Sequence, residues 1–302
     1  MYNKYVGGRC YYLNDEIKKL KSSYKVAVLM IIIFIIMATG VTYAWFNFSA
    51  LTSTNVTPTG GTISVGESII LISNSRQGPF EKTCKLVLEG NPERIRPVTT
   101  EKLEHFFEAI AQNTEGVSLL YKNVDGDVNK DMIHGTVYFQ CLNAPCDVYF
   151  EKDNLKLGSD NTALASMRLG LKITSGRGEE SYIFKLDDLG NTAGVSGKAT
   201  IPVSGDKVVS DISDDGRPQF VDDPALNIGE YMATKTDRRN EFNTGKSKLM
   251  SLVPDEVATV EYWMYLEGCD EQCINAAQGR DAQISLAFAG VDTSDRQKED
   301  VR

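Results

Sequence analysis

Residues 260–266 read VEYWMYL, and residues 167–174 read MRLGLKIT. In each stretch an apolar side chain occupies every second position, so one face of the extended chain is apolar throughout. The same alternation returns in ISLAF at residues 284–288. A period of two is typical of antiparallel sheets that bury one face and expose the other. These stretches therefore predict a mainly β body.

Five further stretches are rich in β-branched and aromatic residues, which favours strands. They are residues 69–72, 85–88, 136–140, 148–150 and 182–186. Many short strands between Gly-, Asn- and Asp-containing turns favour an antiparallel, jelly-roll-like sandwich. We expect this sandwich over residues 67–291, with long surface loops around one or two short strands at 188–245. A polar tail follows at residues 292–302.

One stretch of the body has a helical pattern instead. Between residues 100 and 111 the apolar side chains recur at spacings of three and four residues: Leu103, Phe106, Phe107 and Ile110. Thr100 is placed to cap the start of such a helix. We therefore expect one short helix inserted at 100–111, with His105 off its apolar stripe and facing solvent.

Composition narrows the classes of function. The 302 residues include 41 acidic and 32 basic side chains, for a net charge of −9, and 42% of the residues are hydrophobic. So acidic a chain argues against nucleic-acid binding, which needs clustered Lys and Arg. Two histidines leave little scope for imidazole chemistry, and the sequence contains no zinc-protease, serine-hydrolase or phosphate-loop motif. We expect no catalytic residue and no cofactor. An extracellular hydrolase with converging carboxylates is the least favoured alternative.

The N-terminal region has the layout of an export segment. Residues 1–25 contain six basic and two acidic side chains, and residues 26–44 contain no charge. About 20 apolar residues cross a bilayer as a helix. Lysines on the N-terminal side of such a helix keep that side in the cytoplasm. We expect a basic head at 1–25, a signal or transmembrane helix at 26–44, and a body outside the cell or on its surface.

Two fates are open for this helix. Thr42 and Ala44 are small residues at the −3 and −1 positions of a cut before Trp45. Signal peptidase would then release a chain that begins at Trp45. Retention would instead hold the body on the plasma membrane through its N-terminal helix. We expect cleavage, with anchoring as the alternative.

The cysteines outside the head predict disulfide bonds. Cys10 falls in the cytoplasmic head, where thiols stay reduced. Two close pairs are expected to form short disulfide loops: Cys141 with Cys146, and Cys269 with Cys273. A bond from Cys84 to one of these four stays open. Zinc is less favoured, because the spacings C-x₄-C and C-x₃-C differ from the usual C-x₂-C pair.

An acidic stretch places oxygen-bearing side chains at alternate positions: Asp125, Asp127, Asn129 and Asp131. This spacing resembles the start of a calcium-binding loop. However, Lys130 stands where such a loop requires Gly, and Thr136 stands where it requires Glu. An ordinary Asp- and Asn-rich turn is the favoured interpretation. We therefore predict no metal site, and calcium stays an open alternative.

Several short motifs resemble the TasA/camelysin (CalY) group of Gram-positive surface proteins. The junction TYAWF at 42–46 is similar to the site that a SipW-type signal peptidase cuts in that group. GTISVG at 61–66 and QISLAF at 283–288 are similar to strands near the two ends of the family's body. YLEGCDEQC at 265–273 also resembles clostridial relatives. These motifs leave residues 74–255 unplaced.

The resemblance implies an exported jelly roll that assembles into fibres of the extracellular matrix, with itself or related matrix subunits as partner. In such fibres a freed N-terminal segment fills a groove of the next subunit as a donated strand. The matching segment is residues 45–57, within an N-terminal arm at 45–66. Its apolar anchors are Trp45, Phe46, Phe48, Leu51 and Val56. The sequence contains no zinc-protease motif that would support the metalloprotease activity described for camelysin-type members.

The apolar arm suits such an assembly, because apolar surface gains about 25 cal/mol per Å² when it is buried. A head-to-tail contact of this kind yields an open filament. Packing of the arm as the first strand of its own sandwich is the alternative. The alternative function is a membrane-anchored binding or adhesion module that does not polymerise.

Overall fold

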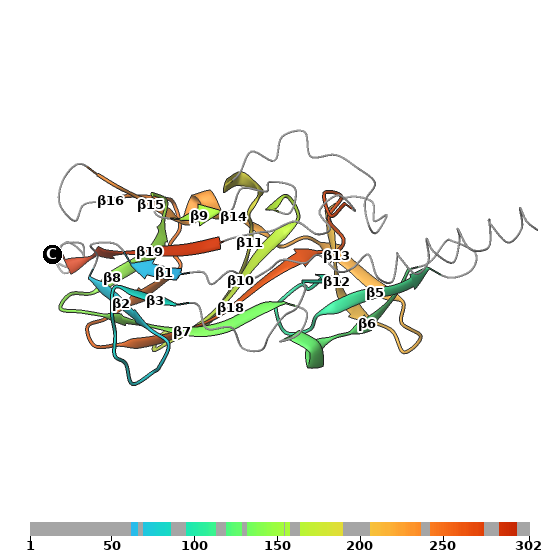
Figure 1. Ribbon diagram of the computed structural model, residues 1–302, viewed down its shortest axis with the longest axis horizontal. Helices are drawn as coiled ribbons and strands as arrows, with labels where there is room; N and C mark the ends of the chain where they lie inside the picture. The colour runs from blue at the N-terminus through green and yellow to red at the C-terminus, as the bar shows by residue number, and fades with distance from the viewer. Residues whose placement is uncertain are drawn as a thin grey trace, which may run out of the picture. The chain divides into compact units, whose positions relative to one another are not determined.

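The computed structural model describes residues 62–65, 69–85, 95–112, 119–128, 132–153, 155–157, 164–189, 206–236, 242–274 and 284–294. This part of the chain is mainly β, which confirms the fold class predicted from the alternating stretches. Two large sheets and two separate hairpins contain the strands (Figure 1). The basic head, the apolar segment at 26–44 and the residues after 294 lie outside the described residues.

The eight-stranded sheet contains, in spatial order, β16 (Phe242–Thr244), β15 (Met232–Lys235), β8 (Cys146–Glu151), β19 (Ile284–Asp292), β1 (Thr62–Val65) and β3 (Thr83–Lys85). Two short strands flank it: β17 (Met250–Leu252) pairs with β8, and β9 (Lys156–Leu157) pairs with β19. The seven-stranded sheet contains β14 (Leu226–Asn227), β11 (Gly178–Lys185), β10 (Met167–Ser175), β18 (Val257–Glu267), β7 (Ile133–Cys141) and β2 (Ile70–Ser73), with β4 (Pro97–Val98) beside β18.

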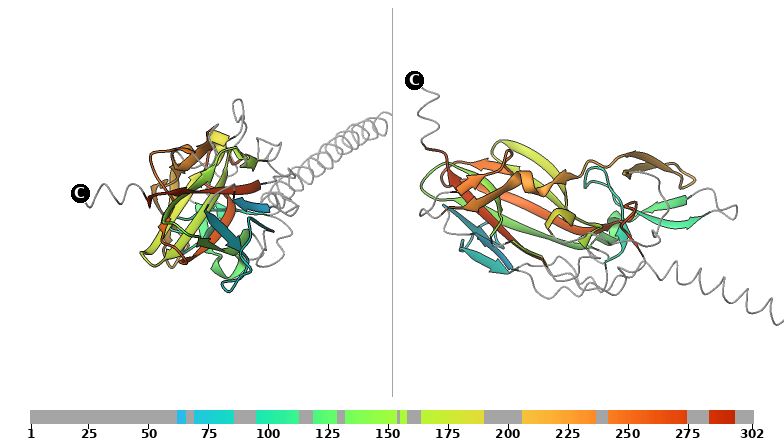
Figure 2. Two further views of the ribbon diagram at one scale, coloured as in Figure 1. Left: turned by 90° about the vertical axis from the view of Figure 1, so that its left-hand side faces the viewer. Right: turned by 90° about the horizontal axis from the view of Figure 1, so that it is seen from above.

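Two hairpins stand apart from the sheets. One joins β5 (Phe107–Gln112) to β6 (Leu119–Asn123), and the other joins β12 (Lys207–Ile212) to β13 (Pro218–Asp222). Three views place both hairpins near the end of β18, and the β2–β3 connection at the opposite end of the sheets (Figures 1 and 2). Three short 3₁₀ turns complete the described elements: η1 (Asp125–Asp127), η2 (Asp187–Leu189) and η3 (Ile228–Tyr231).

Most neighbouring strands are antiparallel, as expected. Four pairs among the described strands are parallel instead: β1 with β19, β4 with β18, β8 with β15, and β11 with β14. Parallel neighbours need a long crossover between them. Alternation within one strand carries no information about the direction of its neighbour, so the sequence did not reveal these pairs.

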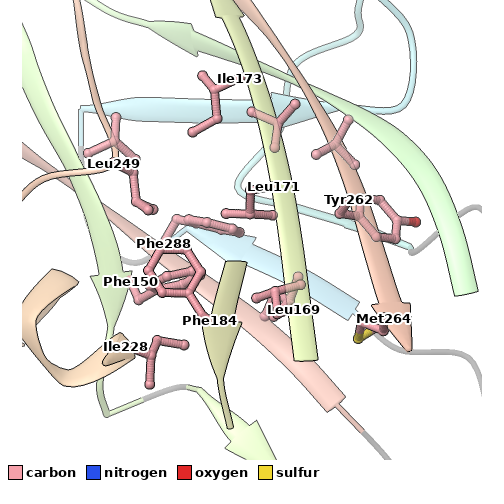
Figure 3. Packing of buried hydrophobic residues seen from close by; sticks show 14 of the residues in the cluster. Phe150, Leu169, Leu171, Ile173, Phe184, Ile228, Leu249, Tyr262, Met264 and Phe288 are labelled. Atoms are coloured by element: carbon pink, nitrogen blue, oxygen red, sulfur yellow. The ribbon is translucent and has the colours of Figure 1, made fainter. Parts of the chain in front are cut away.

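The two sheets pack face to face around one apolar core. On β10 and β18 the predicted apolar faces meet in register, with Leu169 opposite Met264 and Leu171 opposite Tyr262. Rings from the eight-stranded sheet reach those of the other sheet: the Phe150 and Phe184 centroids are 5.3 Å apart, nearly perpendicular. Figure 3 shows these side chains directed into the same space between the sheets. The inner faces are therefore those that the period of two predicted.

The helix predicted at 100–111 is not present. Residues 101–104 form a bend, and β5 begins at Phe107. Thr100 Oγ1 does accept a hydrogen bond from Leu103 N at 3.1 Å, but Leu103 has a φ of +61°, which ends any helical turn. The apolar residues of the expected stripe are buried in different clusters, and Ile110 is 46% exposed. Tertiary packing has overridden the local pattern.

No helix within the described residues has the length and apolar character needed to cross a membrane. The prediction that His105 faces solvent is confirmed, since 64% of its side chain is exposed.

Strand β1 belongs to the arm expected at 45–66, and it lies inside its own chain's sheet, between β19 and β3. The expected strand at 85–88 overlaps β3 at Lys85, and residues 86–88 lie outside the described chain.

Candidate assembly edge

The edges of the two sheets meet at β2 and β3. The eight-stranded sheet ends at β3, whose one neighbour among the described strands is β1. The seven-stranded sheet ends at β2, which pairs with β7. An edge strand leaves one row of backbone N–H and C=O groups outside the ladder, and a further strand can pair with that row. The outer side of β3 is therefore a place where a strand from outside this part of the chain can be added.

The connection from β2 to β3 is a structured loop. Ile72 and Glu81 exchange two backbone hydrogen bonds of 2.8 Å. Gly78 N donates to Ser75 O at 3.0 Å, and Gly78 has a φ of +83°, a conformation that glycine adopts without strain. Ser75 N also donates to Ser73 Oγ at 3.1 Å. These bonds hold the loop in shape beside the edge.

A hollow of ≈590 Å³ lies along this connection. Its apolar lining comes from Ile72, Pro79 and Cys84, and its polar lining includes Ser73 and Asn74. Cys84 is half-buried, and burial raises the pKa of its thiol to about 11, so the sulfur stays protonated and acts as a small apolar group. Alternate side chains of an added strand point to one side, so the hollow can receive them.

The direction of β1 determines where the N-terminal arm joins the body. Thr62, the first residue of β1, lies opposite Lys85, and Ser64 lies opposite Thr83. Because Thr83 and Cys84 line the hollow, the chain enters β1 at the end of β3 that is away from it. The described chain therefore begins β1 beside Lys85, and the hollow lies beside Thr83 and Cys84.

The disulfide prediction is wrong for the described cysteines. No disulfide bond joins the described cysteines, which are Cys84, Cys141, Cys146, Cys269 and Cys273. Cys141 Sγ donates to Ala144 O at 2.6 Å, and Cys269 Sγ lies 3.5 Å from Tyr121 Oη. Close spacing in sequence does not by itself place two sulfur atoms in bonding geometry. Burial raises the pKa of the Cys146 and Cys269 thiols, which keeps them in the less reactive protonated form.

The acidic stretch at 125–131 forms a turn where the structure describes it. Asp125 Oδ1 accepts from Phe106 N at 2.7 Å, and Asp125 Oδ2 accepts from Asn123 Nδ2 at 2.8 Å and lies 2.8 Å from His105 Nδ1. These bonds lower the pKa of Asp125. Both carboxylate oxygens of Asp125 thus contact groups of the protein itself, as in an ordinary Asp-rich turn. Asn129 and Asp131 lie outside the described residues. No cluster of potential metal ligands occurs within the described ranges.

A buried group of charges that the alternating pattern does not predict lies on the outer face of β10 and β18. Arg168, which the alternation placed on the wet face, is 1% exposed, and Glu267 is 2% exposed. Asp223 and Asp270 lie against Arg168, from segments distant in sequence. In the sequence, the signal of this buried group is a charged residue, Arg168, inside an otherwise apolar strand. The positions of its partners in the sequence follow no regular spacing, so they could not be predicted.

The remaining site residues predicted from sequence belong to the N-terminal segment, outside the described residues. The cleavage position between Ala44 and Trp45 lies outside the described residues, and so do the remaining arm anchors, Phe46, Phe48, Leu51 and Val56. Comparison with known proteins yields no match: no family model, no curated protein and no solved structure is detectably similar to this chain.

Proposed function

We propose that this protein is an exported structural subunit of a cell-surface fibre or biofilm matrix, assembled head-to-tail by strand donation. The N-terminal arm of one copy, anchored by Trp45, Phe46 and Phe48, pairs with the outer side of β3 in the next copy. The N-terminal helix guides export until signal peptidase cuts before Trp45. The two sheets are then a jelly roll of the kind that the resemblance implies, and the chain performs no catalysis.

One observation carries the proposal: among the described strands β3 is an edge with a hollow beside it, and the chain enters β1 opposite Lys85, which does not line that hollow. A contact between the arm of one copy and the edge of another is head-to-tail, and repeating such contacts gives a filament. The partners are therefore further copies of this chain or related matrix subunits.

A membrane-anchored binding module that does not polymerise is the second candidate. The pairing of β1 on both sides within its own sheet favours it, because that sheet needs no donated strand to place β1. Mass spectrometry of the native N-terminus separates the two candidates. A chain that begins at Trp45 supports release and assembly, and an intact helix at 26–44 supports anchoring.

The direct test compares the chain that begins at Trp45 with one that lacks residues 45–57. Negative-stain microscopy and light scattering should show filaments for the first and monomers for the second. Equal assembly by both would show that the arm is not the donated strand. Monomers in both, over a range of concentration and pH, would refute the proposed polymer.

Matched variants test the acceptor edge. Thr83 and Asn243 are exposed residues on the two opposite edge strands of one sheet, β3 and β16. A lysine on an edge strand discourages further strand pairing. Thr83→Lys should abolish most filament mass, whereas Asn243→Lys should assemble like the unaltered chain. Loss of filaments in Asn243→Lys alone would move the acceptor to the other edge.

A further inference from the structure

The β12–β13 hairpin is attached to the seven-stranded sheet at its base. Asp206 and Asp223 flank the hairpin, and Asp223 N donates to Asp206 O at 3.1 Å. Lys185 Nζ on β11 lies 3.4 Å from Asp223 Oδ2 and 4.0 Å from Asp206 Oδ2. Higher on the hairpin, Val209 N donates to Thr99 Oγ1 at 3.0 Å. Ion pairs and a backbone hydrogen bond thus hold the hairpin at its base, and a hydrogen bond to Thr99 holds it along β12.

Beneath this base, the outer face of β10 and β18 is buried. Arg168 lies opposite Tyr265 in register, and Glu267 N donates to Ser166 O. Because alternate residues of a strand share a face, the side chains of Arg168, Tyr265 and Glu267 point to the same side of the sheet. Each is at most 2% exposed. Charges on this face therefore lie outside bulk water, where an unpaired charge is costly.

The guanidinium of Arg168 joins the sheet to the hairpin. Its Nη2 lies 2.6 Å from Asp270 Oδ2 and 3.3 Å from Asp223 Oδ2. Arg168 and Lys185 thus supply two positive charges for two buried carboxylates, Asp223 and Asp270. The charges within this group balance without any contribution from Glu267.

Glu267 is a third carboxyl group at the same place. Its Oε1 accepts a hydrogen bond from Cys269 N at 3.1 Å, and no cation among the described residues forms an ion pair with it. The titratable or charged groups that act on it are Arg168 on β10, Tyr121 on β6, Tyr265 on β18, Asp223 after β13 and Cys269 in the turn after β18, and Thr99 forms a side-chain hydrogen bond with it. Desolvation raises the pKa of Glu267 to about 8, which outweighs the opposing effect of Arg168.

We propose that Glu267 is a pH-sensitive latch for the β12–β13 hairpin. While Glu267 holds its proton, Arg168 is free to hold Asp223 and so the base of the hairpin. When the proton leaves to solvent, a third negative charge faces Asp223 and Asp270 and competes for Arg168. Asp223 belongs to the hairpin, whereas Glu267 and Arg168 are fixed within strands. The hairpin is therefore the part that opens.

Opening uncovers a defined surface. Val209 is fully buried against Phe107, Tyr121 and Cys269, in a small cluster separate from the core between the sheets. Release of β12 exposes this cluster while the sandwich core stays closed. The latch does not rest on the fibre proposal, since it concerns the opposite end of the body from the hollow beside β3.

Hydrogen exchange detected by mass spectrometry tests the latch on the whole chain in detergent, with rates corrected for the intrinsic effect of pH. Loss of one proton with a pKa near 8 predicts that opening of residues 206–223 rises about tenfold per pH unit between pH 6 and pH 8, and by up to about a hundredfold between pH 6 and pH 9. β10 and β18 should keep their protection. Glu267→Gln, which cannot ionise, should remove the pH dependence. Glu261→Gln, on the same strand, should leave it unchanged.

Equal protection of the hairpin at pH 6 and pH 9 in the unaltered chain would overturn the latch. So would an undiminished pH response in Glu267→Gln. If that variant does not fold, Asp223→Asn gives an independent answer, because it removes the hairpin's own partner of Arg168. It should open residues 206–223 already at pH 6, with little further change at pH 9. A hairpin that stays protected in Asp223→Asn would equally contradict the latch.

Discussion

Strands β10 and β18 bury their inner face along its length and their outer face around Arg168 and Glu267, with different chemistry on the two sides. The inner face is wholly apolar and packs against the eight-stranded sheet. The outer face combines an apolar cluster around Trp263 and Tyr265 with the charges of Arg168 and Glu267. Burial of apolar area is favourable wherever it occurs, whereas a buried charge is tolerated only with its partners in place. The two faces should therefore respond differently to substitution and to pH.

Arg168→Met is expected to have the largest effect, because it leaves Asp223 and Asp270 buried without their shared cation. Breaking a buried ion group in this way costs about 4 kcal/mol of unfolding free energy. Urea denaturation at pH 7 measures it. Lys172→Met is the matched control on the same face of β10, where the ion pair with Glu179 is half-exposed and contributes less than about 1 kcal/mol. Similar losses of unfolding free energy in both variants would show that burial of the ion group around Arg168 does not increase its contribution to stability.

Leu169→Ala tests the inner face. Leu169 is fully buried between Met264 and Phe184, its partners in register on the two neighbouring strands. Loss of a buried leucine side chain and the cavity left behind cost about 3 kcal/mol. This loss should be the same at pH 5 and pH 8, since no charge is involved. Thr174→Ala, at an exposed position of the same strand, should change stability by less than about 0.5 kcal/mol.

The inner face could be predicted from sequence, and the outer face could not. In MRLGLKIT the alternation correctly assigned Met167, Leu169 and Leu171 to the core, and by the same logic placed Arg168 in water. What covers Arg168 comes from residues near 99, 223 and 270, which share no periodic pattern with β10. Local patterns report which face of a strand is apolar, but not whether a distant segment covers the other face.

The same limit explains the helix expected at 100–111. Spacings of three and four residues are compatible with a helix, but here they belong to a bend and a strand that bury side chains in different clusters. Of the candidate site, the sequence indicates the apolar arm at 45–57, but not the sheet edge that could receive it. Which edge stays open depends on the order of all strands, and among the described strands β3 is an edge because β1 is its one neighbour.

The pH dependence of the unaltered chain follows from the outer face. The folded state raises the pKa of Glu267 from 4.5 to about 8, so it binds that proton more tightly than the unfolded chain does. The resulting stability is complete below pH 4.5 and is lost as pH rises through 8. Between pH 6 and pH 8 the unfolding free energy should fall by about 2 kcal/mol. Glu267→Gln should flatten this fall in urea titrations; an equally steep fall in that variant would assign it to other groups.

Gly170→Ala should have the smallest effect, and it tests how closely the covering segment packs. Gly170 lies on the outer face of β10, where an added Cβ would come within 2.5 Å of Leu103 Cδ2. Leu103 is buried, so the crowding should cost about 1 kcal/mol in urea denaturation. Gly126→Ala is the control, because no atom lies within 4 Å of its added Cβ. A double variant with Leu103→Ala should remove the penalty of Gly170→Ala, since a shorter side chain vacates the space. If the two losses simply add, Leu103 is not what the new methyl group meets, and the outer face is covered more loosely than the inner one.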